Sequence, residues 1–76
     1  MTRNKTLQEY IDGGAIIEYY DKEDVPLMIV DDGKVSAGFN WEGRPYSIGR
    51  IMYEGNPITK ARYDKLVKKH EAYLAS

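Results

Sequence analysis

Residues 27–48 read Leu-Met-Ile-Val-Asp-Asp-Gly-Lys-Val-Ser-Ala-Gly-Phe-Asn-Trp-Glu-Gly-Arg-Pro-Tyr-Ser-Ile, and this stretch decides the fold. Two turn dipeptides, Asp32-Gly33 and Glu42-Gly43, each stand between apolar, strand-forming runs. Asp-Gly between such runs is a strong local signal for a β-hairpin. The stretch therefore predicts a three-stranded antiparallel meander, with strands at about 27–31, 35–41 and 44–48.

The pairing of these strands follows if each turn has two residues. The first hairpin then pairs Val30 with Val35, and the second pairs Trp41 with Arg44 and Phe39 with Tyr46. Because side chains alternate between the two faces of a strand, one face collects the large apolar side chains of the meander. These are Met28, Val30, Val35, Ala37, Phe39, Trp41, Tyr46 and Ile48.

A long helix is predicted at the C-terminal end. Asn56-Pro57 combines a good capping residue with a proline suited to the first helical position, and nothing breaks a helix from Pro57 to about Leu74. Apolar side chains at helical spacing give this segment one apolar half. They are Ile58, Tyr63, Leu66, Val67, His70, Tyr73 and Leu74.

The remaining segments give one further helix and two less defined elements. Thr6 and Glu9 have the spacing of a capping box, which predicts a short helix at about 6–12. The β-branched and aromatic run at 15–20 is a candidate fourth strand. Residues 47–55 fit either a short helix that Ser47 caps or a continuation of the third strand, and the sequence leaves both alternatives open.

These elements together predict an α+β fold in one small domain, residues 1–76. A three-stranded antiparallel meander packs its apolar face against the long C-terminal helix. The short N-terminal helix and the candidate fourth strand complete the domain. A chain of 76 residues has room for one core only.

The composition excludes several classes of protein. The chain is 42% apolar and 30% charged with a net charge of -1, which excludes a disordered chain. It has no cysteine, so disulfides and thiolate metal sites are excluded and a reducing, cytoplasmic location is expected. Charges among the first twenty residues interrupt any signal-peptide core. The longest apolar run, 25–30, is far too short to cross a membrane.

The sequence offers no constellation for catalysis or for a cofactor. His70 is the only histidine, and its place on an apolar helix face favours a half-buried core residue over a metal ligand or a base. The glycines form neither of the common phosphate-binding motifs. We therefore expect a protein that is not an enzyme and that has no catalytic residues, metal ligands or cofactor.

Three residues near the second turn are the candidate partner-binding site: Trp41, Arg44 and Tyr46. Tryptophan, tyrosine and arginine are the residue types that most often dominate the energetics of protein interfaces. The competing interpretation is that Trp41 only covers the core beneath the C-terminal helix. The leading functional hypothesis is a small non-catalytic module that binds another protein, or a second copy of itself, stoichiometrically as an adaptor, inhibitor or regulator.

An uneven charge distribution supports an alternative function. Residues 1–32 hold three basic and eight acidic side chains, whereas residues 33–76 hold eight basic and four acidic ones. Arg62, Lys65 and Lys69 form a stripe on the C-terminal helix and are candidate phosphate-binding residues. The alternative is a small nucleic-acid-binding regulator of winged-helix type, with the second hairpin as its wing. The same stripe could instead balance acidic charge within the fold, and the net charge of -1 favours that simpler interpretation.

Overall fold

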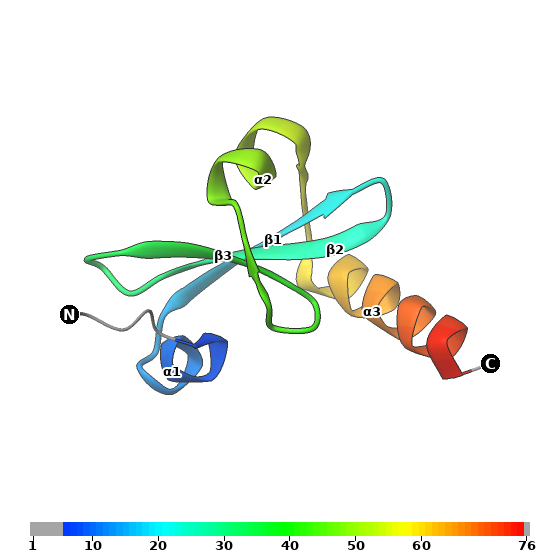
Figure 1. The fold of residues 1–76 in the computed structure, drawn as a ribbon, viewed down its shortest axis with the longest axis horizontal. Coiled ribbons are helices and arrows are strands. Elements are labelled where there is room, and N and C mark those ends of the chain that lie inside the picture. The colour runs from blue at the N-terminus through cyan, green and yellow to red at the C-terminus, as the bar shows by residue number, and fades with distance from the viewer. Residues whose placement is uncertain (1–5, 76) are drawn as a thin grey trace.

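The computed structural model describes residues 6–75, so Arg3 and Lys5, which belong to the acidic half of the sequence, lie outside the described residues. The chain forms an antiparallel sheet of five strands in the order β4-β3-β2-β1-β5, with three helices (Figure 1). The predicted α+β class, with a C-terminal helix packed on the sheet, is confirmed. In chain order the elements are α1 (Leu7–Asp12), β1 (Ile16–Lys22), β2 (Val25–Asp31), β3 (Ser36–Asn40), β4 (Pro45–Tyr46), α2 (Ile48–Glu54), β5 (Asn56–Ile58) and α3 (Lys60–Ala75).

The candidate fourth strand is present as β1, and it is joined to β2 by a tight hairpin. Lys22 pairs with Val25, which leaves Glu23 and Asp24 as a two-residue turn. Both turn residues have positive φ, 52° and 66°, as the turn type that best matches the twist of a hairpin requires. β2 lies at the centre of the sheet and is buried on both faces from Pro26 to Val30.

The first predicted hairpin is present, but its register is wrong by two residues. Val30 pairs with Ala37 rather than with Val35, because the turn has four residues instead of two. The Asp32 carboxylate explains the longer turn, since its Oδ1 accepts hydrogen bonds from the backbone N–H of both Lys34 and Val35 at 2.8 Å. A shift of two residues keeps the side chains of the paired strand residues on their predicted face. Val35 is the exception, because it falls in the longer turn and is 58% exposed instead of facing the core.

The second predicted hairpin is also present, but its pairing register is wrong by one residue. This error has a larger consequence than the two-residue error in the first hairpin. Tyr46 pairs with Gly38, whereas the two-residue turn would have paired it with Phe39. The carboxamide of Asn40 accepts hydrogen bonds from the N–H groups of Glu42 and Arg44, so the turn closes over three residues. A shift of one residue moves side chains to the opposite face.

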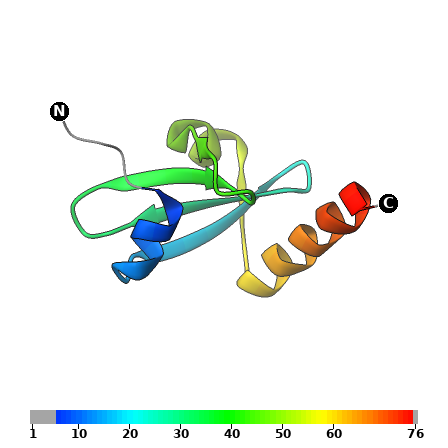
Figure 2. The same ribbon diagram turned by 60° about the horizontal axis from the view of Figure 1, so that its bottom comes forward.

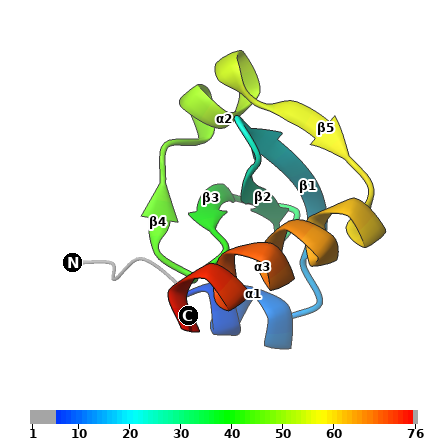
Figure 3. The same cartoon turned by 90° about the vertical axis from the view of Figure 1, so that its right-hand side faces the viewer.

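The sheet therefore has two apolar faces instead of one (Figure 3). On the first face, covered by α1 and α3, a cluster forms from Tyr10, Met28, Val30, Phe39 and Tyr63. On the second face, covered by α2, a cluster forms from Leu27, Ile29 and Ile51, with Tyr20, Tyr46 and Ile48 packed against it. The prediction that Tyr46 and Ile48 belong to the first face is wrong.

The start of the C-terminal helix also differs from the prediction. Asn56 and Pro57 do not cap a helix but lie in β5, which pairs with Tyr19–Asp21 of β1. The helix begins after Thr59, whose hydroxyl accepts a hydrogen bond from the N–H of Arg62 at 3.1 Å. Thr59 therefore caps α3 in place of Asn56.

The two shorter helices follow their local signals. α1 has the predicted capping box between Thr6 and Glu9. Of the two alternatives for residues 47–55, the helix is the one found, with the hydroxyl of Ser47 accepting a hydrogen bond from the N–H of Arg50. Because Ser47, the N-cap of α2, directly follows Tyr46, β4 ends after two residues.

The molecule is elongated, with principal extents of 41 × 26 × 21 Å. The turn between β2 and β3 projects at one end, and the C-terminal end of α3 lies at the other (Figures 1 and 2). The β2–β3 turn and the C-terminal end of α3 therefore lie at opposite ends of the molecule.

Candidate functional site

Trp41 lies in the three-residue turn between β3 and β4, and it faces α3. Its ring stacks on His70, with centroids 5.7 Å apart and an interplanar angle of 26°. The side chain is half-buried and packs against the cluster on the first face of the sheet. This placement matches the competing interpretation of Trp41, as a residue that covers the core beneath the C-terminal helix.

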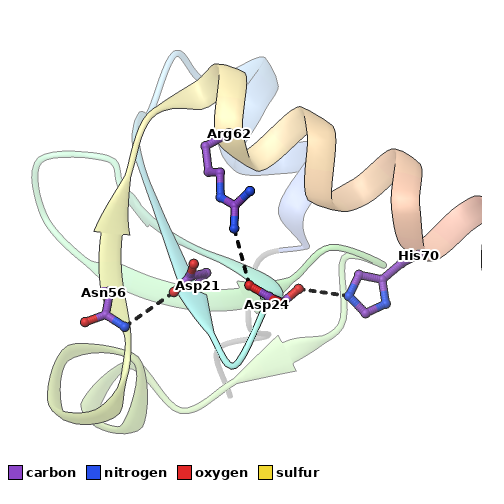
Figure 4. A network of polar contacts seen from close by, with 5 residues as sticks. All are labelled: Asp21, Asp24, Asn56, Arg62 and His70. Atoms are coloured by element: carbon purple, nitrogen blue, oxygen red, sulfur yellow. Dashed lines mark hydrogen bonds and ion pairs between the residues drawn. The ribbon is translucent and has the colours of Figure 1, made fainter.

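A set of polar contacts attaches α3 to the β1–β2 turn (Figure 4). The Nη2 of Arg62 lies 3.3 Å from Oδ1 of Asp24, and the Nε2 of His70 lies 3.0 Å from the backbone oxygen of the same residue. A carbonyl oxygen can only accept, so Nε2 of His70 is the donor. Arg62, one of the three candidate phosphate-binding residues, is thus engaged in an ion pair within the fold.

The other basic residues of α3 differ in their surroundings. Lys60 pairs with Asp64 at 3.0 Å, and this hydrogen bond raises the pKa of the Lys60 ammonium. Lys65 and Lys69 are exposed, as is the neighbouring Lys68, and within residues 6–75 none of the three forms an ion pair. The predicted stripe therefore retains two of its three charges for an external ligand.

The three candidate partner-binding residues do not form one surface. Trp41 faces α3, whereas Tyr46 packs beside Ile51 on the opposite face of the sheet. Arg44 is exposed and hydrogen-bonds through its carbonyl oxygen to the N–H of Asn40, so it is not the cross-strand partner of Trp41. Arg44 directly precedes β4 and pairs with Asn40, so it lies on the same face of the sheet as Tyr46, two residues further along.

A groove of about 310 Å³ lies beside the uncovered end of β3, and it is not among the sites predicted from the sequence. It occupies the place where β4 would continue if the chain did not turn into α2 at Ser47. Four elements or their flanking residues contribute to its lining: Tyr10 from α1, Val35 and Ala37 from the start of β3, Pro45 and Tyr46 from β4, and Ile48 from α2. The only sequence signal for it was the capping pattern at Ser47, which ends β4 after two residues.

A second hollow, of about 550 Å³, is larger than the groove but differs in character. It lies along α3 and is lined by Lys69, His70, Ala72 and Tyr73, all from that one helix. A hollow with a single wall gives a ligand few convergent contacts. The groove at β3, in contrast, has walls on both faces of the sheet and a strand as its floor.

Electrostatic effects are found away from the groove. Lys22 of β1 and Glu54 of α2 form an ion pair of 2.8 Å, and the hydrogen bond to Lys22 lowers the pKa of the Glu54 carboxyl. The hydroxyl of Tyr20 donates to Glu18 at 2.9 Å, and this bond raises the pKa of Tyr20. Burial raises the pKa of Tyr63 to about 12. None of the residues with these shifts lines the groove.

The described part of the chain holds no group of three or more histidine, cysteine, aspartate or glutamate side chains arranged to bind a metal ion. None of the helices between residues 6 and 75 has the length and apolar character needed to span a membrane.

Comparisons of the chain with protein-family models, with characterised proteins and with solved structures find no match.

Proposed function

We propose that this protein is a non-catalytic binding module that takes up an extended segment of a partner protein as an additional strand beside β3. The observation that carries the proposal is the groove at the uncovered end of β3. Proteins commonly bind extended peptides at open sheet edges, where main-chain hydrogen bonds give affinity and side-chain pockets give selectivity.

The backbone of β3 offers hydrogen bonds toward the groove. The N–H of Asn40 donates to the carbonyl oxygen of Arg44, which directly precedes β4. In an antiparallel sheet the backbone groups that face one neighbouring strand recur at every second residue. Ser36 therefore directs its N–H and C=O to the same side as Asn40. β4 ends opposite Gly38, so the position opposite Ser36 holds no strand.

A second hydrogen bond gives the same orientation independently. The N–H of Asp32 donates to the carbonyl oxygen of Val35 at 3.2 Å, so the backbone N–H and C=O groups of Val35 point toward β2. The backbone N–H and C=O groups of Ser36, the next residue, consequently point away from β2 and into the groove.

The walls suit apolar side chains on both faces of an added strand. Tyr10 and Pro45 flank the groove on the side of α1, and Tyr46 and Ile48 flank it on the side of α2. Successive side chains of an extended segment point to opposite faces. Adjacent residues of a bound segment would therefore each meet an apolar wall.

The opposite edge of the sheet is less suited to this role. β5 has three residues and contains Pro57, which lacks an N–H. Proline on an edge strand is a common way to prevent pairing with another chain. The two edges thus differ, and the edge at β3 is the better acceptor for a strand.

A second copy of this chain fits the groove less well than a different partner does. Two copies of β3 would pair antiparallel, and each copy carries its own β4 on the edge that would have to pair. The uncovered parts of the two β3 strands would then meet mainly at the turn of residues 32–35, which is not a strand. We therefore favour a partner segment from another protein, and self-association becomes one outcome of the test.

The experiment is panning of a phage-displayed library of random twelve-residue peptides on the immobilised protein and on two variants. Val35→Asp places a charge in the groove at a side chain that is 58% exposed, so the fold tolerates it. Tyr53→Asp is the matched control, because Tyr53 is 92% exposed on α2 and does not line the groove.

The wild type and Tyr53→Asp should enrich the same peptides, and Val35→Asp should lose them. N-methylation of one backbone position in an enriched peptide should abolish its binding, since an added strand depends on main-chain hydrogen bonds. Equal enrichment on all three proteins, or indifference to N-methylation, would count against the proposal. Light scattering of the three proteins at several concentrations would reveal a dimer that occupies the groove instead.

A second candidate function, nucleic-acid binding, is favoured by the basic surface of α3. Lys65, Lys68 and Lys69 are exposed and unpaired within the described residues, and such side chains bind phosphates through release of counterions. A mobility-shift titration with duplex DNA and with RNA at 50 and 200 mM salt tests it. Binding that weakens steeply with salt and is lost on Lys65→Gln/Lys69→Gln supports this function, and absent or salt-insensitive binding removes it.

A further inference from the structure

We infer that the segment bound beside β3 is the N-terminal end of its chain and that it runs antiparallel to β3. The inference rests on the proposed function and names the kind of segment that the partner supplies. Two features of the groove carry it. The protein's own chain blocks one end of the groove and leaves the other end open, and the uncovered end of β3 directs the backbone groups of one residue, Ser36, into it.

The end of the groove nearest β4 is closed by the chain that leaves this strand. Tyr46 fills the sheet edge opposite Gly38. The Cα atom of Ile48 lies 3.3 Å from the place that a Cβ atom of Gly38 would take, so the chain has crossed onto the second face within two residues. Figure 3 shows the same passage from β4 into α2. A strand beside Ser36 that continued toward β4 would therefore meet Tyr46 and Ser47 end-on.

The other end of the groove leads to solvent. β3 begins at Ser36, and the turn before it, residues 32–35, projects from one end of the molecule (Figures 1 and 2). Val35, which lines the groove at this end, is 58% exposed. A bound segment can therefore leave the groove past Val35 but not past Tyr46.

The backbone groups of Ser36 select the direction of the segment. In an antiparallel pair, the N–H and C=O of one residue both bond to the single residue opposite, whereas in a parallel pair they bond to the two residues on either side of it. One of those two residues would lie opposite Ala37, where the chain leaves β4 toward Ile48. Only an antiparallel segment satisfies both groups of Ser36 within the space that is open.

The direction decides which end of the segment is blocked. β4 is itself antiparallel to β3, so an antiparallel segment runs in the same direction as β4 and continues its line. The N-terminal side of the segment then points back at Tyr46, and its C-terminal side leads past Val35. The residue opposite Ser36 is therefore the first of the segment, and the second residue lies opposite Val35.

The experiment pans three phage libraries that display eight random residues in different settings. In the first library the random residues form a free N-terminus, in the second they form a free C-terminus, and in the third they lie between two fixed stretches. Each library is panned on the wild type, on Val35→Asp and on Tyr53→Asp. Only the first library should yield binders to the wild type and to Tyr53→Asp, and Val35→Asp should lose them.

Synthetic peptides measure the effect of an extension. An enriched peptide is compared by fluorescence anisotropy with two versions that carry additional threonines, one version at the N-terminus and the other at the C-terminus. Threonine favours an extended backbone, so the N-terminal extension is driven against the chain that leaves β4. It should weaken binding by about two- to tenfold, the loss of one main-chain hydrogen bond to Ser36. The C-terminal extension should leave the affinity unchanged.

A disulfide locates the first residue of the segment. The chain has no cysteine, so Val35→Cys introduces a single thiol. The backbone groups of Val35 point toward β2, so the residue opposite it in the groove forms a pair without hydrogen bonds, with Cα atoms about 4.5 Å apart. A disulfide can span that distance. A cysteine at the second position of the enriched peptide should therefore cross-link to the Val35→Cys variant, and the matched peptide with cysteine at the fourth position should not.

The possible failures are distinguishable. If the third library enriches as well as the first and N-methylation still abolishes binding, the requirement for a chain end is refuted and the binding of an added strand stands. If the second library yields binders that Val35→Asp loses, the antiparallel direction is overturned. If cysteine at the fourth position cross-links faster than at the second, the position of the first residue is overturned. If no library enriches, the proposed function itself fails.

Discussion

Replacement of Gly38 by alanine is the most direct test of the second apolar face of the sheet. Gly38 is buried in β3, opposite Tyr46 and beneath α2. A Cβ atom at this position would lie 2.5 Å from the backbone oxygen of Tyr46 and 2.8 Å from Cδ1 of Ile51. Contacts this short do not occur, so β4 and α2 must move away from β3.

The size of the effect follows from how far the neighbours must move. Ordinary contact begins at 3.4 Å, so the Tyr46 oxygen has to retreat by about 0.9 Å from its 2.5 Å position. One extra methyl in a packed core costs about 1–3 kcal/mol. We expect the upper half of that range, about 2–3 kcal/mol, because one of the two obstacles is backbone and the other is a side chain with 0% exposure.

Urea unfolding followed by far-ultraviolet circular dichroism measures the loss. With a slope of about 1 kcal/mol per molar urea for a domain of this size, the midpoint of Gly38→Ala should fall by about 2–3 M. Gly49→Ala is the matched control, because this glycine lies in α2 with its nearest neighbour atom, Oγ of Ser47, at 3.8 Å. Alanine in a helix is favoured over glycine, so the control should gain about 0.5–1 kcal/mol.

The two substitutions are chemically identical, and opposite signs are expected. An unfolding midpoint for Gly38→Ala equal to or above that of the wild type would refute the pairing of Gly38 with Tyr46, and with it the description of the second face.

Three further predictions concern stability. Ile51→Ala should lower the free energy of unfolding by about 2–5 kcal/mol, measured in urea, because it leaves a cavity at a side chain with 0% exposure. The pKa of Tyr63 is raised to about 12 by burial, so stability should be lost as the pH rises from 10 through 12, by about 2–3 kcal/mol. Tyr63→Phe should remove most of that loss in alkaline titrations of thermal stability. The pKa of Glu54 is lowered by its hydrogen bond to Lys22, so its contribution is present above pH 4.5 and is lost as the pH falls through the folded-state pKa. Glu54→Gln should flatten this acid limb, and an unchanged limb would contradict the ion pair.

Features set by local chemistry were predictable from the sequence. The capping box at Thr6 and Glu9 begins α1, and the strand-forming residues of 27–40 form β2 and β3. The inward set Met28, Val30 and Phe39 is on the predicted face. These side chains are on the predicted face although the predicted register is wrong, because the register differs by two residues and side chains on one face of a strand recur every two residues.

The errors arose where a side chain or a distant strand supplied hydrogen bonds that no dipeptide encodes. Two carboxamide or carboxylate groups, from Asn40 and Asp32, bind turn N–H groups and lengthen both turns. Asn56-Pro57 has a strong local preference to begin a helix, but the free edge of β1 pairs with it as β5. Tertiary pairing outweighs a local preference of about 1 kcal/mol.

The candidate site was only partly visible in the sequence for the same reason. Tyr46 lines the groove that we propose as the binding site, Arg44 is not among the lining residues, and Trp41 packs on His70 against α3. The prediction grouped the three because it assumed a two-residue turn, which would have placed Trp41 and Tyr46 on one face. Their roles in binding stay predictions, and Trp41→Ala is expected to affect stability as well as any contact with a partner.

The groove itself follows from the length of the turn after Asn40. With a two-residue turn, Tyr46 would face α1 and α3, and the strand after it could continue along β3 and cover Ser36. With three residues, Tyr46 instead turns its ring to the second face, where it packs against the cluster that includes Ile51. The chain must then cross to that face, and the capping hydroxyl of Ser47 begins α2 at once. β4 is left two residues long, and the end of β3 is left open. The turn that the Asn40 carboxamide helps to close therefore precedes both features: the packing of Tyr46 on the second core cluster, and the short β4 that leaves open the edge of β3 where we expect a partner to bind.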